Sequence, residues 1–334
     1  MIEGHGDDSY KYSYIRADFS SNVPTGTDLS GLKAYLSERF ETVMHYPEPE
    51  PRSLEREMAE QFRIDPDCIM ITAGATDAIY LTARLFAQKR IAITEPTFAE
   101  YRDACRLNGC EIISTADPYS PPACVSAQWL CNPNNPTGRV WDFVRLQAAI
   151  EKQGDVFFVA DQSYEYFTRQ PLFAPAESVK HRNLIIIGSM TKRYAIPGLR
   201  LGYLIAPAAI CNRLRLLRAP WSVNALAIEA GHYLLQHKIT SVSPEILIEE
   251  CARIARELKQ SDRYLPEPTD THFMLVRTMS GTAAALKKHL AQQVGILIRD
   301  ASNFEGLTPD YFRIAALSKA DNDLLINALL QWNG

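Results

Sequence analysis

Residues 184–206 read LIIIGSMTKRYAIPGLRLGYLIA, and this stretch decides both the fold and the chemistry that we expect. Its two ends, residues 184–189 and 201–206, are apolar runs that predict buried strands. Between these runs, Lys192 lies three residues after Ser189 and eight residues before Arg200. A hydroxyl and a guanidinium can bind a phosphate dianion, while the lysine amine forms a Schiff base with an aldehyde. The stretch therefore predicts a lysine-bound cofactor that carries a phosphate.

Lys192 has two other interpretations. A single lysine is most often a solvated surface charge. The Ser-x-x-Lys spacing of Ser189 and Lys192 also occurs in penicillin-binding proteins, together with Ser-Asp-Asn and Lys-Thr-Gly motifs. Neither of these two partner motifs occurs in the sequence, which argues against that class of enzyme.

The sequence before this stretch alternates short apolar runs with amphipathic segments. Strands are predicted at residues 68–74, 91–96, 111–115, 128–133 and 156–161. Helical patterns between the strands include residues 97–109 and 141–153. Near-continuous apolar strands that alternate with helices indicate an α/β fold with a mostly parallel sheet covered on both faces.

The pattern changes after Trp221, where helical stretches at residues 225–237 and 244–260 lead into shorter strands. Such a pattern is typical of a smaller α+β unit. We therefore predict a large, cofactor-binding domain over residues 46–222. Residues 1–45, with an N-terminal arm, and residues 223–334 are predicted to form the small domain.

The composition limits the class of protein. The 334 residues are 46% apolar, and the net charge of −4 gives no sign of a nucleic-acid or membrane-surface partner. Seven cysteines without a Cys-x-x-Cys pair argue against a disulfide framework and against a metal site. The first residues lack the basic and apolar regions of a signal peptide, and no apolar run is long enough to span a bilayer. We expect a cytoplasmic protein.

Further motifs lie at the predicted ends of strands. Gly74-Ala75-Thr76 begins a helix, whose backbone N–H groups can bind phosphate. Asn132–Gly138 contains two Asn-Pro steps that fix an extended loop. Asp161 ends a strand, where a buried carboxylate can keep a pyridine nitrogen protonated. Phe98 or Tyr101 is suited to stack on a flat ring. Taken singly, each motif also has a purely structural explanation as a turn or a core residue.

In this order, the motifs resemble those of the fold-type I, aspartate-aminotransferase-like superfamily, which contains the class I and II aminotransferases. The family order is a Gly-rich phosphate turn, a stacking aromatic residue, NPxNPTG, DxxY, SxxK, GxRxG and a late Arg-Ile pair, and it covers nearly the whole chain. The resemblance implies a pyridoxal-5′-phosphate (PLP) enzyme with a large domain and a smaller α+β domain. It also implies a homodimer, because Tyr46 resembles the tyrosine that reaches the cofactor phosphate of the partner subunit.

The resemblance implies a role for each matching residue. Lys192, Asp161 and Tyr164 are the expected catalytic residues: Lys192 forms the Schiff base and moves protons, and Asp161 pairs with the pyridine nitrogen. The other expected cofactor ligands are Asn135 and Tyr164 at the phenolic oxygen, Phe98 on the ring face, and Gly74, Ala75, Thr76, Ser189 and Arg200 at the phosphate. Arg313 resembles the arginine that binds the substrate α-carboxylate as a bidentate pair.

Two groups of the superfamily have the most similar motifs: the L-threonine-O-3-phosphate decarboxylases of cobalamin biosynthesis and the histidinol-phosphate aminotransferases. The stretches that look more like the decarboxylases are residues 191–205, 219–227, 296–307 and 311–315. The opening GHGDD and the later DFSSNVP resemble their HGGN and DFSxNxxP segments, which implies that His5 and Asn22 lie near the substrate. The change from HGGN to HGDD leaves the role of His5 open, and an unbound terminal residue is the alternative.

Arg299 and Arg313 lie near the ends of two neighbouring apolar runs. Two guanidiniums suit a substrate that carries both a carboxylate and a phosphate. The alternative is that Arg299 forms a structural ion pair with Asp300 or Glu305. The predicted substrate is thus a small phosphorylated amino acid.

The predicted reaction is decarboxylation of L-threonine O-3-phosphate to (R)-1-amino-2-propanol O-2-phosphate. The alternatives are a histidinol-phosphate or related aminotransferase, and a non-catalytic regulator with the PLP fold. The retained Lys192 and Asp161 argue against the regulator. Sequence alone does not show which Cα bond is broken, so the preference for a decarboxylase rests on the resemblance.

Overall fold

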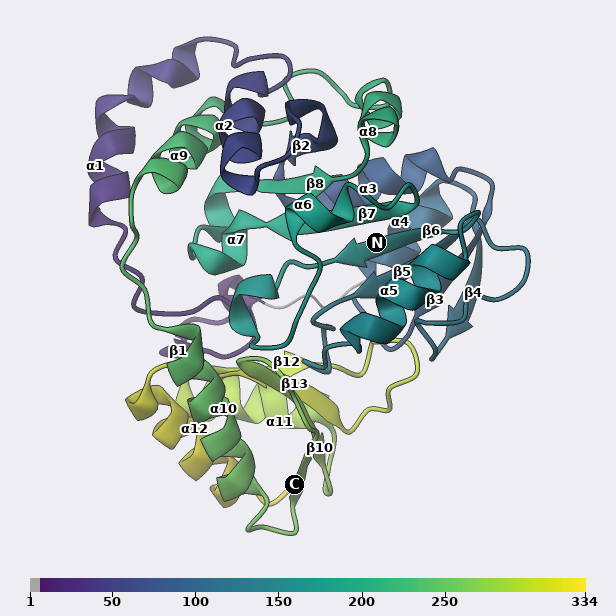
Figure 1. Cartoon of the computed structure of the whole chain (residues 1–334). Coiled ribbons are helices and arrows are strands. Elements are labelled where there is room, and N and C mark those ends of the chain that lie inside the picture. Colours follow the sequence, from purple (N-terminus) through teal and green to yellow (C-terminus); the bar gives the residue numbers. More distant parts are fainter. Residues whose placement is uncertain (1–6) are drawn as a thin grey trace.

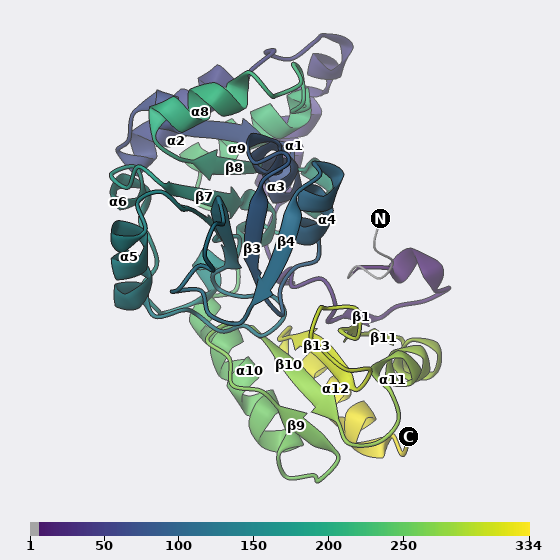
Figure 2. The same ribbon diagram turned by 90° about the vertical axis from the view of Figure 1, so that its right-hand side faces the viewer.

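A computed structural model describes residues 7–334 of the chain (Figures 1 and 2). Its centre is a seven-stranded sheet in the order β2-β8-β7-β6-β5-β3-β4. The strands are β2 (Ile69–Thr72), β3 (Arg90–Thr94), β4 (Glu111–Thr115), β5 (Ala127–Cys131), β6 (Phe157–Asp161), β7 (Leu184–Ser189) and β8 (Gly202–Ile205). β8 runs antiparallel to both of its neighbours, and the other pairs are parallel. The predicted α/β fold with a mostly parallel sheet is confirmed.

Alternating side chains of these strands enter two cores, one on each face of the sheet. Ile186 packs on one face, and its neighbours Ile185 and Ile187 pack on the other. The first face is covered by α2 (Arg52–Phe62), α5 (Phe143–Lys152) and α9 (Ala225–Gln236). The second face is covered by α3 (Gly74–Leu85), α4 (Glu100–Leu107) and α8 (Ala208–Arg215). Burial on both faces explains why these strands are apolar throughout.

A smaller α+β unit lies beside the large sheet (Figure 1). Its antiparallel sheet has the order β12-β13-β10-β9, formed by β9 (Tyr264–Pro266), β10 (Phe273–Thr278), β12 (Arg299–Asp300) and β13 (Tyr311–Ala315). Its helices are α10 (Pro244–Leu258), α11 (Ala283–His289) and α12 (Lys319–Gln331). The N-terminal strand β1 (Ala17–Asp18) pairs with β11 (Ile296–Leu297), and Phe19 enters the core of this unit.

Two helices pack differently from the predicted division into domains. The predicted boundaries place residues 1–45 and 223–334 in the small domain. However, α1 (Ser30–Glu38) and α9 contribute Leu32 and Ala227 to the core of the large sheet. An amphipathic pattern indicates that a helix has a buried face, but it does not indicate which core receives that face. Among residues 7–334, every helix is too short or too polar to cross a membrane.

Candidate active site

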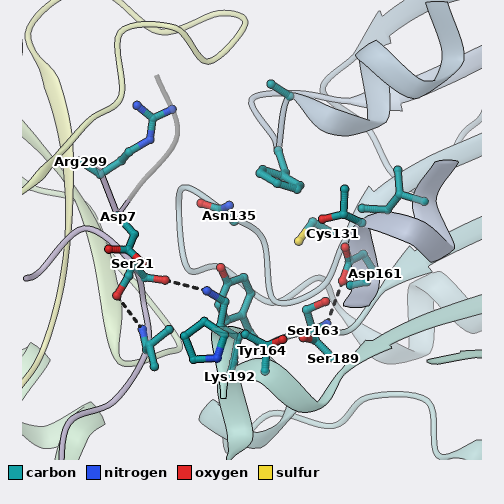
Figure 3. Close-up of a pocket in the computed structure, with 18 of the residues that line it drawn as sticks. Asp7, Ser21, Cys131, Asn135, Asp161, Ser163, Tyr164, Ser189, Lys192 and Arg299 are labelled. Carbon is teal, nitrogen blue, oxygen red and sulfur yellow. Dashed lines mark hydrogen bonds between the residues drawn. The ribbon is translucent and has the colours of Figure 1, made fainter. Parts of the chain in front are cut away.

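A pocket lies at the carboxyl ends of β5, β6 and β7, where the large sheet faces β12 and β13 (Figure 3). Ligands of open, mostly parallel sheets bind at such strand ends. The predicted site residues that line the pocket are Ala75, Thr76, Phe98, Asn135, Asp161, Tyr164, Ser189, Lys192, Arg200, Arg299 and Arg313. The structure therefore brings together residues that are up to 238 positions apart in the chain (75 to 313).

Lys192 lies in the short helix α7 (Met190–Arg193), directly after β7. Its Nζ donates a hydrogen bond of 2.7 Å to the carbonyl oxygen of Ser21. Burial, and then the positive charges of Arg313 and Arg200, lower the pKa of Lys192 to about 8. A lysine with so low a pKa is partly neutral near pH 7, and only the neutral amine is a nucleophile.

One end of the pocket is built to accept an anion. Gly74 begins α3 with a φ of +83°, and a Cβ at this position would come within 2.6 Å of an Arg200 guanidinium nitrogen. A Cβ at Gly202 would likewise come within 2.6 Å of the backbone nitrogen of Ala75. Gly74 thus leaves room for the Arg200 guanidinium, and Gly202 lets β8 pack closely against the start of α3. Such an arrangement suits a phosphate.

Asp161 lies at the carboxyl end of β6 and is 4% exposed. One carboxylate oxygen accepts the backbone N–H of Ser163 at 2.8 Å, and the other accepts the hydroxyl of Tyr101 at 2.8 Å. Burial raises the pKa of Asp161, and the bonds from Ser163 and Tyr101 oppose that rise. A buried carboxylate held in this way is suited to pair with a protonated ring nitrogen.

Arg313 of β13 and Tyr164, which follows β6, also line the pocket. The Arg313 guanidinium donates to the side-chain oxygen of Asn135 and to the carbonyl oxygen of Ser20. Because its oxygen is occupied, the Asn135 amide keeps its N–H donors for another partner. The Tyr164 hydroxyl accepts a hydrogen bond of 3.3 Å from the Asn22 amide, and burial raises its pKa to about 12.

Three consecutive backbone carbonyls form a strap across the side chains of the site. The carbonyls of Ser20, Ser21 and Asn22 contact Arg313, Lys192 and His272, respectively. Asn22 adopts a φ of +54°, which turns the strap so that its side chain reaches Tyr164. This strap is one part of the site that sequence reasoning missed, because a backbone acceptor carries no residue-type signal. Asn22 itself was predicted near the substrate.

Arg299 and Arg313 are direct partners in the ladder between β12 and β13, so both side chains leave the sheet on one face. They are 6% and 4% exposed. Arg299 donates to the Asp300 carbonyl oxygen at 2.5 Å and to the Asn303 side-chain oxygen at 2.7 Å. Burial and the charge of Arg313 lower its pKa to about 10. Among residues 7–334, Arg299 has no carboxylate within 4.0 Å, so the alternative ion pair with Asp300 or Glu305 is absent there.

The remaining predicted residues have other positions. Tyr46 is 86% exposed, outside the pocket, and its ring lies 5.3 Å from that of Trp221. His5 lies outside the described residues. Of the two aromatic candidates for ring stacking, Phe98 lines the pocket with its ring edge-on to Tyr101, whereas the hydroxyl of Tyr101 is bound to Asp161. Asp7, Ser163 and His272 were not predicted.

Unpartnered polar atoms support a pocket that takes a ligand. Among the described residues, the Ser163 hydroxyl and the Nε of Arg313 are buried without a hydrogen-bond partner, and both residues line the pocket. Buried polar groups are rarely left unpaired in native proteins. The site therefore combines a partly neutral lysine, a buried carboxylate, an anion-binding helix start and two arginines.

Comparisons with known proteins agree with this geometry. The family described as "Aminotransferase class I and II" matches residues 16–329. A "Threonine-phosphate decarboxylase" of Salmonella typhimurium is 32% identical over 93% of this chain and 90% of its own length. The crystal structure of L-threonine-O-3-phosphate decarboxylase from Porphyromonas gingivalis has a TM-score of 0.90 and 36% identity, and it covers 93% of this chain and 98% of its own. A "Histidinol-phosphate aminotransferase" of Caldanaerobacter subterraneus is 28% identical over 85% of this chain and 83% of its own length.

Proposed function

Because the chain belongs to the class I and II aminotransferase family, and is therefore a PLP-dependent enzyme, we propose that it decarboxylates L-threonine O-3-phosphate. The product is (R)-1-amino-2-propanol O-2-phosphate, a building block of cobalamin. The names of the relatives with 32% and 36% identity support this choice over transamination. The single observation that carries it is the pair of buried arginines, Arg299 and Arg313, in the same pocket as Lys192.

The residues of the pocket fit PLP. When bound, PLP supplies an aldehyde for an amine and a conjugated ring that takes up the electron pair of a broken Cα bond. Lys192 is the amine that would hold it, and Asp161 would pair with its ring nitrogen. Asn135 and Tyr164 would bind its phenolic oxygen, and Phe98 would pack against its ring. The residues that would hold the phosphate are Gly74, Ala75, Thr76, Ser189 and Arg200.

The two arginines select the substrate. Arg313 binds the α-carboxylate, since its guanidinium is buried, charged and fixed by Asn135 and Ser20. Arg299, its ladder partner, binds the substrate phosphate. Each guanidinium presents a planar set of donors that matches a carboxylate or phosphate group. Asn22 holds the Tyr164 hydroxyl beside them.

The assay that tests this function separates decarboxylation from transamination. The enzyme is incubated with L-threonine O-3-phosphate in the absence of 2-oxoglutarate, and released CO₂ is measured. We expect CO₂ and aminopropanol phosphate in equal amounts. Arg299→Gln removes a charged donor from the phosphate, and we expect its KM to rise by about one order of magnitude or more.

The matched incubation contains histidinol phosphate and 2-oxoglutarate, and glutamate is measured. Glutamate formation at a higher kcat/KM than CO₂ release would contradict the proposed decarboxylase and identify the aminotransferase. Unphosphorylated L-threonine is the control for the substrate class, because it retains the carboxylate for Arg313 but leaves Arg299 without an anion.

A homodimer is part of the proposed function, because Tyr46 is exposed and lies outside the pocket of its own chain. Tyr46 belongs to an exposed patch of large apolar side chains. Their exposed fractions are 61% for Phe40, 78% for Met44, 86% for Tyr46 and 48% for Trp221. Phe40 and Met44 are the two ends of η2 (Phe40–Met44), which contacts α9. Tyr46 follows η2, and its ring contacts that of Trp221. An exposed apolar patch of this kind marks an interaction site. A second copy of the chain would cover it and receive Tyr46 at its cofactor phosphate.

Light scattering is expected to give the mass of two chains. Met44→Glu places a charge in the exposed patch and should produce monomers, because burying an unpaired carboxylate in an interface is unfavourable. Leu107→Glu is the matched control, since Leu107 is 75% exposed on α4 and lies outside the patch. A monomeric wild type, or equal masses for the two variants, would contradict this arrangement.

A further inference from the structure

The described chain begins with a segment that crosses the edge of the pocket. Asp7 lines the pocket and lies between Arg299 and Ser21 in Figure 3. The next residue, Asp8, is buried, and both of its carboxylate oxygens accept from Lys287 of α11 at 2.8 Å. The short helix η1 (Ser9–Lys11) follows. The buried ion pair of Asp8 thus fixes the position of Asp7 in the pocket.

The backbone of Asp7 is held in an unfavourable conformation. Its φ is +60°, in the left-handed region that residues with a Cβ rarely adopt. Its N–H donates to the Ser20 hydroxyl at 2.8 Å, and that hydroxyl donates to Asp18 at 2.6 Å. Non-glycine residues in such conformations gather at functional sites, where their surroundings hold them. Glycine would fit this backbone more easily, so the carboxylate has been placed here at a conformational cost.

Asp7 changes the charge balance at the substrate end of the pocket. Among the described residues that line the pocket, the carboxylates are Asp7 and Asp161, and Asp161 lies at the end of β6. The charged groups on the elements around Asp7 are Lys192 of α7, Arg299 of β12, Arg313 of β13, Asp18 of β1, Lys287 of α11, and Asp8 and Lys11 of its own segment. Asp8 and Lys287 neutralise each other. Among residues 7–334, neither Arg299 nor Arg313 has a carboxylate partner within 4.0 Å, so Arg313 can balance a substrate carboxylate and Arg299 can balance one charge of a phosphate.

The second charge of a phosphate dianion would face Asp7. We propose that Asp7 makes this enzyme bind its phosphorylated substrate as the phosphate monoanion, whose remaining P–OH donates a hydrogen bond to the Asp7 carboxylate. Like charges in one pocket disfavour each other, whereas an O–H donor and a carboxylate attract. This inference rests on the proposed function, because it assumes that the substrate carries a phosphate at Arg299.

The test compares two unreactive ligands on the PLP-loaded enzyme. The first is 3-phosphooxybutyrate, which has both anionic groups but no amine. The second is 3-sulfooxybutyrate, whose ester keeps one negative charge throughout the range used. Dissociation constants are measured by calorimetry between pH 6 and pH 8. Titration of the enzyme affects both ligands alike, so the ratio of the constants reports the ionisation of the phosphate.

In the wild type, the dissociation constant of the phosphate ester is expected to rise about fiftyfold relative to the sulfate ester between pH 6 and pH 8, because a phosphate monoester loses its second proton near pH 6 and about one molecule in a hundred keeps it at pH 8. Asp7→Asn and Asp7→Gly should abolish this rise, and glycine also suits the φ of residue 7. Asp155→Asn is the matched control, since Asp155 is exposed in the turn before β6 and should retain the wild-type profile.

A wild-type rise that persists in both Asp7 variants would overturn the inference about Asp7 and leave the proposed function intact. Failure of both ligands to bind the wild type would overturn both, because the substrate end would then not be an anion site. If the enzyme releases no CO₂ from L-threonine O-3-phosphate but shows the expected ratios, the decarboxylase is contradicted and the role of Asp7 stands.

Discussion

Lys192→Ala is expected to reduce turnover by about three orders of magnitude or more, the largest effect of any single change in this chain. Lys192 is the one lysine among the described residues that line the pocket. The variant therefore has no amine among these residues that could bind the aldehyde of PLP covalently. It also loses the side chain that can move a proton at Cα. Turnover is measured as CO₂ release from L-threonine O-3-phosphate.

A second measurement keeps this prediction independent of the substrate. Borohydride reduction followed by peptide mapping should place the cofactor on the peptide that contains Lys192, and reduced Lys192→Ala should carry none. Lys180→Ala, which changes an exposed lysine before β7, is the control and should behave as the wild type. Covalent cofactor on another lysine of the wild type would contradict the assignment.

The pKa of Lys192 gives this reaction a pH dependence. A pKa of about 8 leaves roughly one amine in ten neutral at pH 7, whereas an ordinary lysine is almost wholly protonated. The rate of cofactor attachment to the apoenzyme should therefore rise with pH up to about 8 and level off above it. Arg313→Gln removes the charge that, after burial, contributes most to the lowering, so its profile should shift to higher pH.

The strands and many residues of the pocket could be predicted because each leaves a local signal. A strand buried on both faces is apolar throughout, so residues 184–189 identify β7 directly. Lys192, Asp161 and Arg200 stand at fixed distances from such strands. The carboxyl ends of the parallel strands β6 and β7 bring Asp161 and Lys192 to one edge of the sheet. Arg200 reaches the same edge because it precedes β8, which runs antiparallel to β7.

Other parts of the site could not be predicted because their contacts are between elements. The hydroxyl of Tyr101 binds Asp161 across 60 positions, and nothing in the first turn of α4 distinguishes it from a core tyrosine. The carbonyl of Ser21 binds Lys192 across 171 positions through an atom that every residue has. The packing of α1 and α9 on the large sheet is likewise a property of the assembled fold.

Asp161→Asn is expected to lower kcat by about two to three orders of magnitude while PLP stays bound. The amide has nearly the shape of the carboxylate and can still accept the N–H of Ser163. It carries no negative charge, however, so it cannot hold a proton on the ring nitrogen. When PLP is bound, its ring would then be a weaker electron sink. Two readouts check this: kcat for CO₂ release, and the ¹⁵N chemical shift of ring-labelled PLP, which reports the proton.

Tyr101→Phe is the matched control, because it removes a hydrogen bond from the same carboxylate but leaves the charge. We expect it to lower kcat by less than about tenfold, because the charge of Asp161, and with it the ring proton, is retained. If Asp161→Asn loses no more activity than Tyr101→Phe, Asp161 only orients the site. If Asp161→Asn loses both activity and the ring proton while Tyr101→Phe keeps both, the charge of Asp161 is what the reaction uses, and Tyr101 is a positioning residue that holds the carboxylate at the ring nitrogen.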